Sequence, residues 1–238
     1  MGENTRQPLA EFVGTFTLVF IGAGTGALAE ATNGVGTIGV ALAHGIALLV
    51  IVYAWGSISG AHVNPAVTFG IALTKHITWP KALSYWGAQF LGGIVAAYLL
   101  LYLLGSESNL GVTLGTLTDG GTTPDDPLKA VIVEAVLTFF LLIAVFASGI
   151  GGRSGNAAGV AIGLVLTMDI LMGGMFTGAS MNPARSLGPA LATGNYGNLW
   201  VYFVGPMIGG AAGALLYQQF LPTQEKQPVR AAEGKSKR

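Results

Sequence analysis

The sequence predicts an all-α membrane protein, in which an inverted repeat supplies six transmembrane helices and two half-helices. Three observations lead to this fold class. The composition is that of a polytopic membrane protein, six apolar runs approach the length of a membrane span, and the tripeptide Asn-Pro-Ala occurs twice, each time at the start of a short apolar segment. We therefore expect one membrane domain, residues 1–238, in which the same half is built twice.

The composition places the chain in a lipid bilayer. Hydrophobic residues make up 52% of the 238 residues and charged residues only 9%, and 37 residues are glycine. A water-soluble domain of this size needs far more surface charge. The net charge is zero and the basic residues form no patch before the tail, so we expect no nucleic-acid partner. The absence of cysteine excludes disulfides and thiolate metal sites, and we expect neither a metal nor a cofactor.

The apolar runs give the order of the spans. A transmembrane helix needs ~20 mostly apolar residues. Six runs approach this length, at residues 8–29, 37–57, 82–104, 129–150, 157–175 and 199–220. No clear cleavage site follows the first run, so we interpret it as a span rather than a signal peptide. Two shorter segments, 64–73 and 182–192, are typical of discontinuous helices that meet near the bilayer midplane.

Lysine and arginine placement predicts the orientation. With six spans, one side of the membrane receives Arg6, Lys75, Lys81, Arg153, Lys226, Arg230, Lys235, Lys237 and Arg238. Basic residues gather on the cytoplasmic side, so both termini are predicted to be cytoplasmic. The polar tail, residues 222–238, is predicted to be disordered. The short tails fit the inner (plasma) membrane of a cell, and a vacuolar membrane stays open as an alternative.

The internal repeat extends beyond the tripeptide. The two copies lie 118 positions apart and consist of Asn64, Pro65 and Ala66 and of Asn182, Pro183 and Ala184. Glu11 corresponds to Glu134 at an offset of 123, and the segment from Tyr85 corresponds to that from Tyr202 at an offset of 117. Repeat 1 therefore covers about 8–104 and repeat 2 about 129–220. Each half has three spans, an odd number, so the two halves enter the membrane from opposite faces.

The repeated motif has a definite chemistry. Asparagine caps a helix and proline fits its first turn, so each motif starts a half-helix whose positive dipole end lies in mid-membrane. Two such ends repel cations. The irregular backbone before each motif is tolerated at this depth where it lines a water-filled path. The backbone carbonyls expected to line this path are those of Gly60, Ala61, His62, Gly178, Ala179 and Ser180. A pocket for an anionic substrate at the same dipoles is the alternative.

The combination of motifs resembles the aquaporins of the major intrinsic protein family. The resemblance covers both Asn-Pro-Ala frames, the paired glutamates, His62-Val63 before the first motif and Asn-Pro-Ala-Arg-Ser in the second. It implies six tilted helices, two half-helices, one pore in each subunit and assembly as a homotetramer. It also implies a constriction formed, by spacing from the motifs, by His44, Ile170, Ala179 and Arg185.

This constriction is similar to that of some plant tonoplast intrinsic proteins. Strict water channels of the family usually combine Phe, His, a small polar residue and Arg. Glycerol facilitators usually carry aromatic residues, and Asp after the Arg, where Ser186 stands here. Some of the resembling plant channels also pass ammonia, urea or hydrogen peroxide. The ammonia-permeable type adds a histidine from the third loop, whereas residues 105–128 contain none.

Several polar residues in the spans have competing interpretations. Arg185 is costly in a membrane unless it faces water or a partner, so it is either a pore-lining donor or an ion-pair partner of Asp169. Asp169 holds the loop or Arg185, or caps a backbone amide. Glu11 and Glu134 are read as scaffold residues that accept N–H groups from the half-loops, with a proton relay as the alternative. Gln89 is predicted to have a similar scaffold role.

The sequence thus predicts a passive water channel rather than an enzyme, with water and small neutral solutes such as hydrogen peroxide or ammonia as its passengers. No nucleophile–base pair or two-histidine metal spacing is evident among the three histidines and few acids. A glycerol or urea facilitator is the alternative within the same class. A secondary transporter is the alternative from another class, because transporters also use inverted repeats and broken helices.

Overall fold

The computed structural model describes residues 2–32, 34–106, 108–118 and 126–221. These residues form helices and connecting segments, and within them the only strand-like pairing is an isolated bridge between Gly115 and Thr118. The predicted all-α fold class is therefore confirmed. Residues 222–238, for which a disordered tail was predicted, lie outside the described residues.

The first half of the chain begins with a long rod. It consists of α1 (Glu3–Leu18), a π-helical turn (Val19–Ala23) and α2 (Gly24–Thr32). The rod starts five residues before the apolar run, because the polar residues 3–7 extend the helix and Pro8 lies inside it. The other helices of this half are α3 (Gly36–Ser59), the short α4 (Pro65–Leu73) and α5 (Trp79–Leu104).

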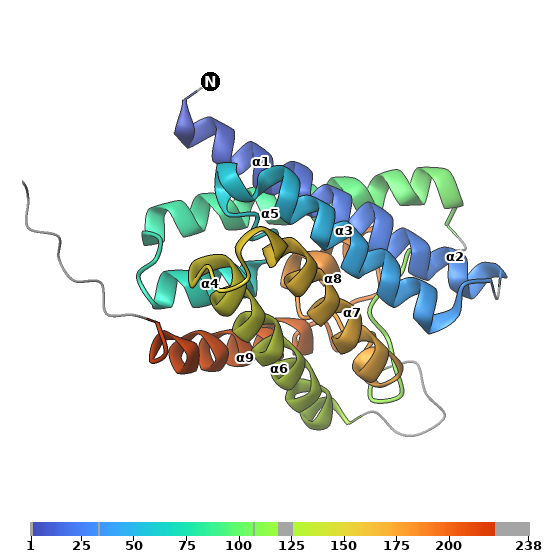
Figure 1. Cartoon of the computed structure of the whole chain (residues 1–238). Coiled ribbons are helices and arrows are strands. Elements are labelled where there is room, and N and C mark those ends of the chain that lie inside the picture. Colours follow the sequence, from blue (N-terminus) through green and yellow to red (C-terminus); the bar gives the residue numbers. More distant parts are fainter. Residues whose placement is uncertain (1, 33, 107, 119–125, 222–238) are drawn as a thin grey trace, which may run out of the picture.

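The second half repeats this order. It contains α6 (Pro127–Ala144), a π-helical turn (Val145–Ile150), a short 3₁₀ turn (Gly155–Ala157), α7 (Ala158–Thr177), the short α8 (Pro183–Thr193) and α9 (Val201–Gln218). Figure 1 shows the long helices around the two short ones, α4 and α8. Each half therefore places one short helix between its second and third long helices.

Five of the six predicted spans are long and apolar enough to cross a membrane. The sixth forms α9, which has 18 residues and is not among the five. At 1.5 Å per residue α9 is ~27 Å long, close to the thickness of the hydrocarbon core. Its glycines and Pro206 lower its hydropathy. The helix begins two residues after the start of the predicted run, 199–220, and ends two residues before the end of that run.

The short helix of each half packs against a long helix of the other half. The long helices pair as α6 with α9, α3 with α7 and α1 with α5, whereas α8 packs on α5 and α4 packs on α9. Glycines allow these crossings. A Cβ on Gly93 would lie 2.6 Å from the Ala184 carbonyl oxygen, and one on Gly210 would lie 2.9 Å from that of Ala66. Each short helix therefore packs directly against the backbone of the opposite half.

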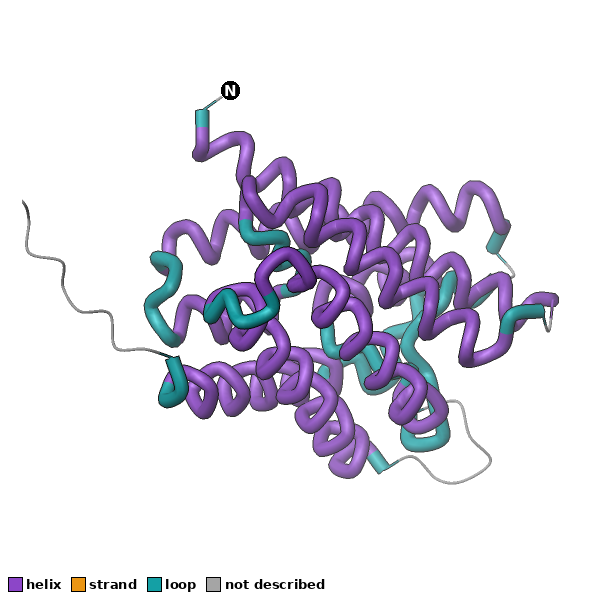
Figure 2. The backbone as a smooth tube through the Cα atoms, viewed as in Figure 1, coloured by secondary structure: helices purple, strands orange, loops and turns teal. Residues whose placement is uncertain are grey.

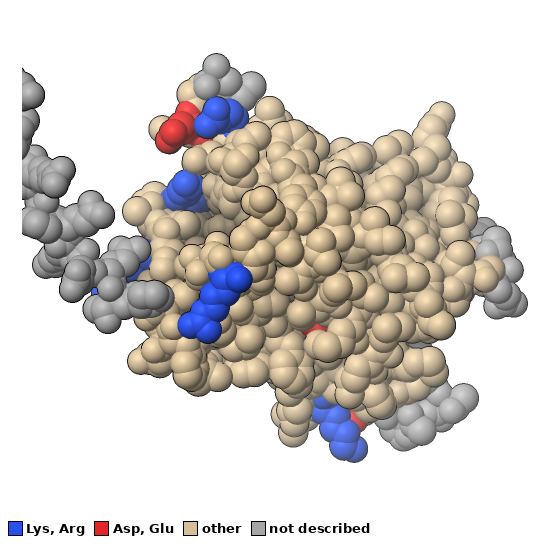
Figure 3. All heavy atoms as spheres, in the orientation of Figure 1, with Lys and Arg blue, Asp and Glu red and all other residues tan. Residues whose placement is uncertain are grey.

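The outer surface suits a lipid environment. Large apolar side chains are exposed along the long helices, among them Ile38, Leu83, Tyr102 and Leu164. Figure 3 shows only a few scattered charged side chains on the visible face. Apolar area on this scale, on a chain with five apolar spans, is the surface that a bilayer covers.

Candidate pore

The segments before α4 and α8 run as irregular backbone in the interior of the helical bundle (Figure 2). The φ angle is positive at matching positions in both, namely Gly60, Ala61 and Val63 and Gly178, Ala179 and Met181. A positive φ costs a residue with a side chain of the order of 1–3 kcal/mol, most of all a β-branched one such as Val63. The surrounding side chains must therefore hold both segments in place.

In repeat 1 the holding group is the buried carboxylate of Glu11 on α1. It accepts hydrogen bonds from the backbone N–H groups of His62 (2.9 Å) and Val63 (2.6 Å) and from the hydroxyl of Ser59 (2.6 Å). The hydroxyl of Tyr85 donates to the carbonyl of Ser59 at 2.8 Å. The half-loop is thus fixed at both ends by side chains from α1 and α5.

In repeat 2 the buried carboxylate of Glu134 on α6 takes the same place. It accepts from the backbone N–H groups of Ser180 (2.9 Å) and Met181 (2.7 Å) and from the hydroxyl of Thr177 (2.7 Å). The Tyr202 hydroxyl lies 2.7 Å from the Thr177 carbonyl oxygen. Each glutamate therefore binds the half-loop of its own repeat, and neither lines the two cavities described below.

Gln89 adds a contact that repeat 2 does not have. Its amide Nε2 donates to Glu11 (2.8 Å) and to the hydroxyl of Thr68 (2.9 Å), which also lies 3.1 Å from Nδ1 of His62. The repeat-related residue of Gln89 is Pro206, which has no side-chain donor. Gln89 therefore ties the carboxylate, the half-loop and α4 together in one half only.

The two asparagines connect the half-loops across the centre. The amide Nδ2 of Asn64 donates to the carbonyl of Met181 (2.8 Å), and that of Asn182 donates to the carbonyl of Val63 (2.9 Å). Each Oδ1 also caps its own half-helix and accepts from the N–H of Ala66 (2.9 Å) or Ala184 (3.0 Å). Since an amide NH₂ has two hydrogens, each asparagine keeps one N–H beyond this bond.

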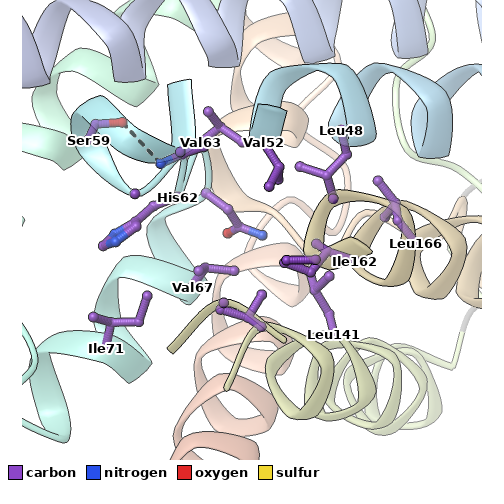
Figure 4. Close-up of a pocket in the computed structure, with 18 of the residues that line it drawn as sticks. Leu48, Val52, Ser59, His62, Val63, Val67, Ile71, Leu141, Ile162 and Leu166 are labelled. Carbon is purple, nitrogen blue, oxygen red and sulfur yellow. Dashed lines mark hydrogen bonds between the residues drawn. The ribbon is translucent and has the colours of Figure 1, made fainter. Parts of the chain in front are cut away.

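A cavity of about 840 Å³ runs past these asparagines. Tyr53, His76 and Asn156 line it at one end, and His44 and Arg185 line it beyond the asparagines. Apolar side chains from four helices point toward one another across it in Figure 4, namely Leu48, Val52, Val67, Ile71, Leu141, Ile162 and Leu166. Gly60, Ala61, His62 and Ser180 are also among the residues that line this cavity. It is thus mostly apolar, with a few polar groups at its middle and ends.

A second cavity, of about 330 Å³, is lined by Ile170, Gly174 and Gly178 and by residues of α2, α3 and the loop after α5. Arg185 lines both cavities. Among the residues that the structure describes, it is the one that both lining sets share. Ala179 lies between Gly178 and Ser180, one on each cavity, but it lines neither of them itself.

Arg185 is held by the loop after α5. Its Nη1 donates to the carbonyl of Gly111 at 2.6 Å, and within the described part of the chain its Nε has no hydrogen-bond partner. The alternative ion pair with Asp169 does not form, because the only ion pair among the described residues joins Lys129 and Asp126. Asp169 is buried beside Ile170, and its Oδ2 has no partner in that same part.

The sequence did not point to Gly111. Its carbonyl reaches Arg185 from 74 positions away, and the backbone is unusual at both Leu110 and Gly111, whose φ angles are 52° and 67°. His44 is buried, and its Nδ1 lies 2.9 Å from the carbonyl oxygen of Val40. A carbonyl only accepts, so Nδ1 is the donor. The structure thus brings His44 and Arg185 to one end of the larger cavity and Ile170 to the adjoining one.

The chain was compared with known families and proteins. Residues 2–217 match the model of the major intrinsic protein family. The chain belongs to this family. Aquaporin TIP1-2 of Zea mays is 42% identical over 224 residues, which cover 90% of this chain and 85% of that protein. Aquaporin TIP2-1 of Arabidopsis thaliana is 40% identical over 238 residues, which cover 96% and 92%.

A solved structure shows the same fold. The X-ray structure of the aquaglyceroporin from Plasmodium falciparum matches with a TM-score of 0.79 at 25% identity, over 91% of this chain and 96% of that one. As a major intrinsic protein the chain is an integral membrane channel of the aquaporin class and not an enzyme. The resemblance inferred from the two Asn-Pro-Ala frames and the paired glutamates is therefore confirmed.

Proposed function

We propose that the chain is a passive water channel whose path runs through the two cavities. The observation that carries this proposal is the row of polar groups along an otherwise apolar path. Asn64 and Asn182 sit at the ends of two facing half-helices, and Arg185 lines both cavities. Helix N-termini and a guanidinium place positive charge along the path, so cations are repelled while neutral water exchanges one hydrogen-bond partner for the next.

We propose His44, Ile170, Ala179 and Arg185 as the constriction, and the carbonyls of the half-loops as the acceptors below it. Ile170 and Ala179 have no side-chain donor, so a passing molecule meets fixed polar groups on one part of the wall only. Such a wall selects by size and lack of charge rather than by a full set of hydrogen bonds. Hydrogen peroxide or ammonia are the further solutes that this wall admits.

The assembly and the host membrane belong to the same proposal. Residues 8–104 and 129–220 act as the halves of one channel domain, and four copies form a homotetramer with one pore in each. Both termini face the cytoplasm. The relatives named TIP favour a vacuolar membrane as the host over the plasma membrane expected from the short tails.

Proteoliposomes test the function directly. Purified protein is reconstituted, and water, ammonia, urea, hydrogen peroxide and glycerol fluxes are measured beside those of an Ile170→His variant. Linear, non-saturating water flux well above that of empty vesicles is expected, together with peroxide or ammonia flux that the histidine variant reduces. Wild type that passes water alone, with an unchanged variant, would refute the wider constriction. Saturable uptake that needs an ion gradient would refute the channel.

A further inference from the structure

The π-helical turn of the first rod contains a glycine that touches a constriction residue. Gly22 lies within the turn Val19–Ala23 and is buried. A Cβ at this position would lie 2.4 Å from both Cδ2 and Nε2 of His44 and 2.8 Å from its Cε1. A real Cβ essentially never lies closer than 3.0 Å to such an atom of another residue, so the imidazole occupies the space that any other residue at position 22 would fill.

The turn separates two packing tasks of this helix. Val19 and Ala23 are fully buried and pack with Ala96 and Leu100 of α5. Gly22, between them, meets α3 instead and receives the edge of the His44 ring. A π turn carries one extra residue and is frequent at functional sites. Here it allows the first rod to fill the core against α5 while it leaves a niche for the ring.

The ring is held between this niche and the larger cavity. Its Nδ1 donates to the carbonyl of Val40 on its own helix, and its Nε2 has no hydrogen-bond partner within the described residues. The same residue lines the larger cavity together with Leu18 and Arg185. Because the ring has the π-helical turn on one side and His44 lines the cavity, we expect a group added at position 22 to displace the ring toward the cavity.

We propose that Gly22 is a positioning residue for permeation: it fixes how far the His44 ring stands back from the path. The inference rests on the proposed channel function and deepens it. The width beside Arg185 depends not only on the side chain at position 44 but also on the absence of a side chain at position 22. A methyl group there narrows the path through His44 and has no such effect once the ring is gone.

The test is a set of variants in proteoliposomes with equal amounts of folded protein. Gly22→Ala is expected to lower water permeability per channel about threefold or more. Gly24→Ala is the matched control on the same rod, because its added Cβ would lie 2.9 Å from Cδ2 of Leu100, the end of a side chain, and all three of its nearest atoms would belong to Leu100 rather than to His44. This control is expected to conduct like wild type. Gly22→Ala in a His44→Ala background is expected to conduct like His44→Ala alone.

The outcomes separate the two proposals. Wild-type vesicles no more permeable than empty ones refute the water channel. Conducting wild type with an equally conducting Gly22→Ala refutes the positioning role, as does an equal loss from Gly22→Ala with and without the His44 ring. If Gly22→Ala does not fold but the double variant does, the ring contact is supported. If neither folds, Gly22 serves the packing of α1, and the inference is overturned.

Discussion

The two half-loops are held by nearly the same contacts, whereas the residues around them differ. Glu11 and Glu134 each accept two backbone N–H groups and one hydroxyl from their own half-loop. In both repeats a tyrosine hydroxyl lies against the first carbonyl of that segment. The duplication is therefore closest where a strained backbone has to be fixed in the interior of the bundle.

The halves diverge at the proposed constriction. Three positions after the cap, repeat 1 has Val67 and repeat 2 has Arg185. Repeat 1 adds Gln89 to its cradle, whereas repeat 2 is contacted by the loop after α5, through Gly111 on Arg185 and Thr113 on Ser186. The shared contacts thus hold the two half-loops alike, whereas the loop after α5 adds side-chain contacts to the half-helix of repeat 2.

Removing either carboxylate should have the largest effect. Glu11→Ala and Glu134→Ala each leave two buried backbone N–H groups without an acceptor, at about 1–3 kcal/mol for each group. They also release residues with a positive φ, against a total stability of about 5–15 kcal/mol. We expect little or no folded protein from either variant in fluorescence-detected size-exclusion chromatography. Glu3→Ala, at an exposed position of α1, is the control. If either variant eluted like this control, its carboxylate would not be needed to hold the half-loop.

Erasing the asymmetry at Arg185 should have the next largest effect. Arg185→Val gives repeat 2 the residue of repeat 1 and removes the charge of a residue that lines both cavities. Proton permeability in vesicles with a pH-sensitive dye is expected to rise about tenfold, equivalent to ~1.4 kcal/mol off the barrier. Arg185→Lys keeps the charge and should keep protons out. If neither variant leaked more protons than wild type, the half-helix dipoles would exclude cations without the guanidinium.

The sequence predicted the parts of this comparison that depend on local chemistry. Asn64 and Asn182 identified the starts of α4 and α8, since a cap followed by proline is a local signal. The first rod, by contrast, begins earlier than its apolar run, since hydropathy does not register the polar turn at residues 3–7. The two π-helical turns lie within apolar runs, and hydropathy does not distinguish them from the α-helix on either side.

Contacts over long sequence distances could not be predicted. The sequence places Asp169 closest to Arg185 among acidic candidates, but the guanidinium instead contacts the Gly111 carbonyl. Any residue carries a carbonyl, so no side-chain pattern identifies Gly111. The contact between Gly22 and His44 could not be predicted either, because a glycine in a membrane helix is as readily explained by helix packing.

A smaller difference is expected between the repeat-related tyrosines. The Tyr85 hydroxyl donates to one carbonyl, whereas the Tyr202 hydroxyl lies 2.7 Å from the carbonyls of Thr177 and Thr113 and 3.0 Å from the Thr118 hydroxyl. Phenylalanine should therefore cost about 1 kcal/mol at position 85 and about 2 kcal/mol at position 202. In one detergent this is a fall in Tm of roughly 2–4 °C for each kcal/mol.

Tyr102→Phe is the control for this pair, because Tyr102 is 84% exposed. It should leave Tm unchanged. Equal losses at positions 85 and 202 would show that the loop after α5 adds nothing to the half-loop of repeat 2.

The smallest effect is expected where the first helices of the two repeats begin. Asp126 caps α6 and accepts from the N–H of Lys129 (3.1 Å) and from its ammonium (2.8 Å), whereas the cap of α1 is Gly2, with no side-chain hydrogen bond. These contacts hold the pKa of Asp126 below its usual value. Its contribution to stability is therefore present above the ordinary aspartate pKa and is lost as the pH falls through the lowered one.

Asp126→Ala should accordingly lower Tm slightly at neutral pH, by less than Tyr85→Phe, because the carboxylate is exposed to solvent. The difference from wild type should vanish in acid, measured by thermal unfolding across a pH series. Lys129→Ala removes the ammonium but keeps the capped backbone N–H, so it should lose only part of the effect. If Asp126→Ala were as harmful as Glu134→Ala at neutral pH, the start of α6 would anchor repeat 2 as strongly as its buried carboxylate does, and the half-loop would no longer be the element that the fold chiefly has to secure.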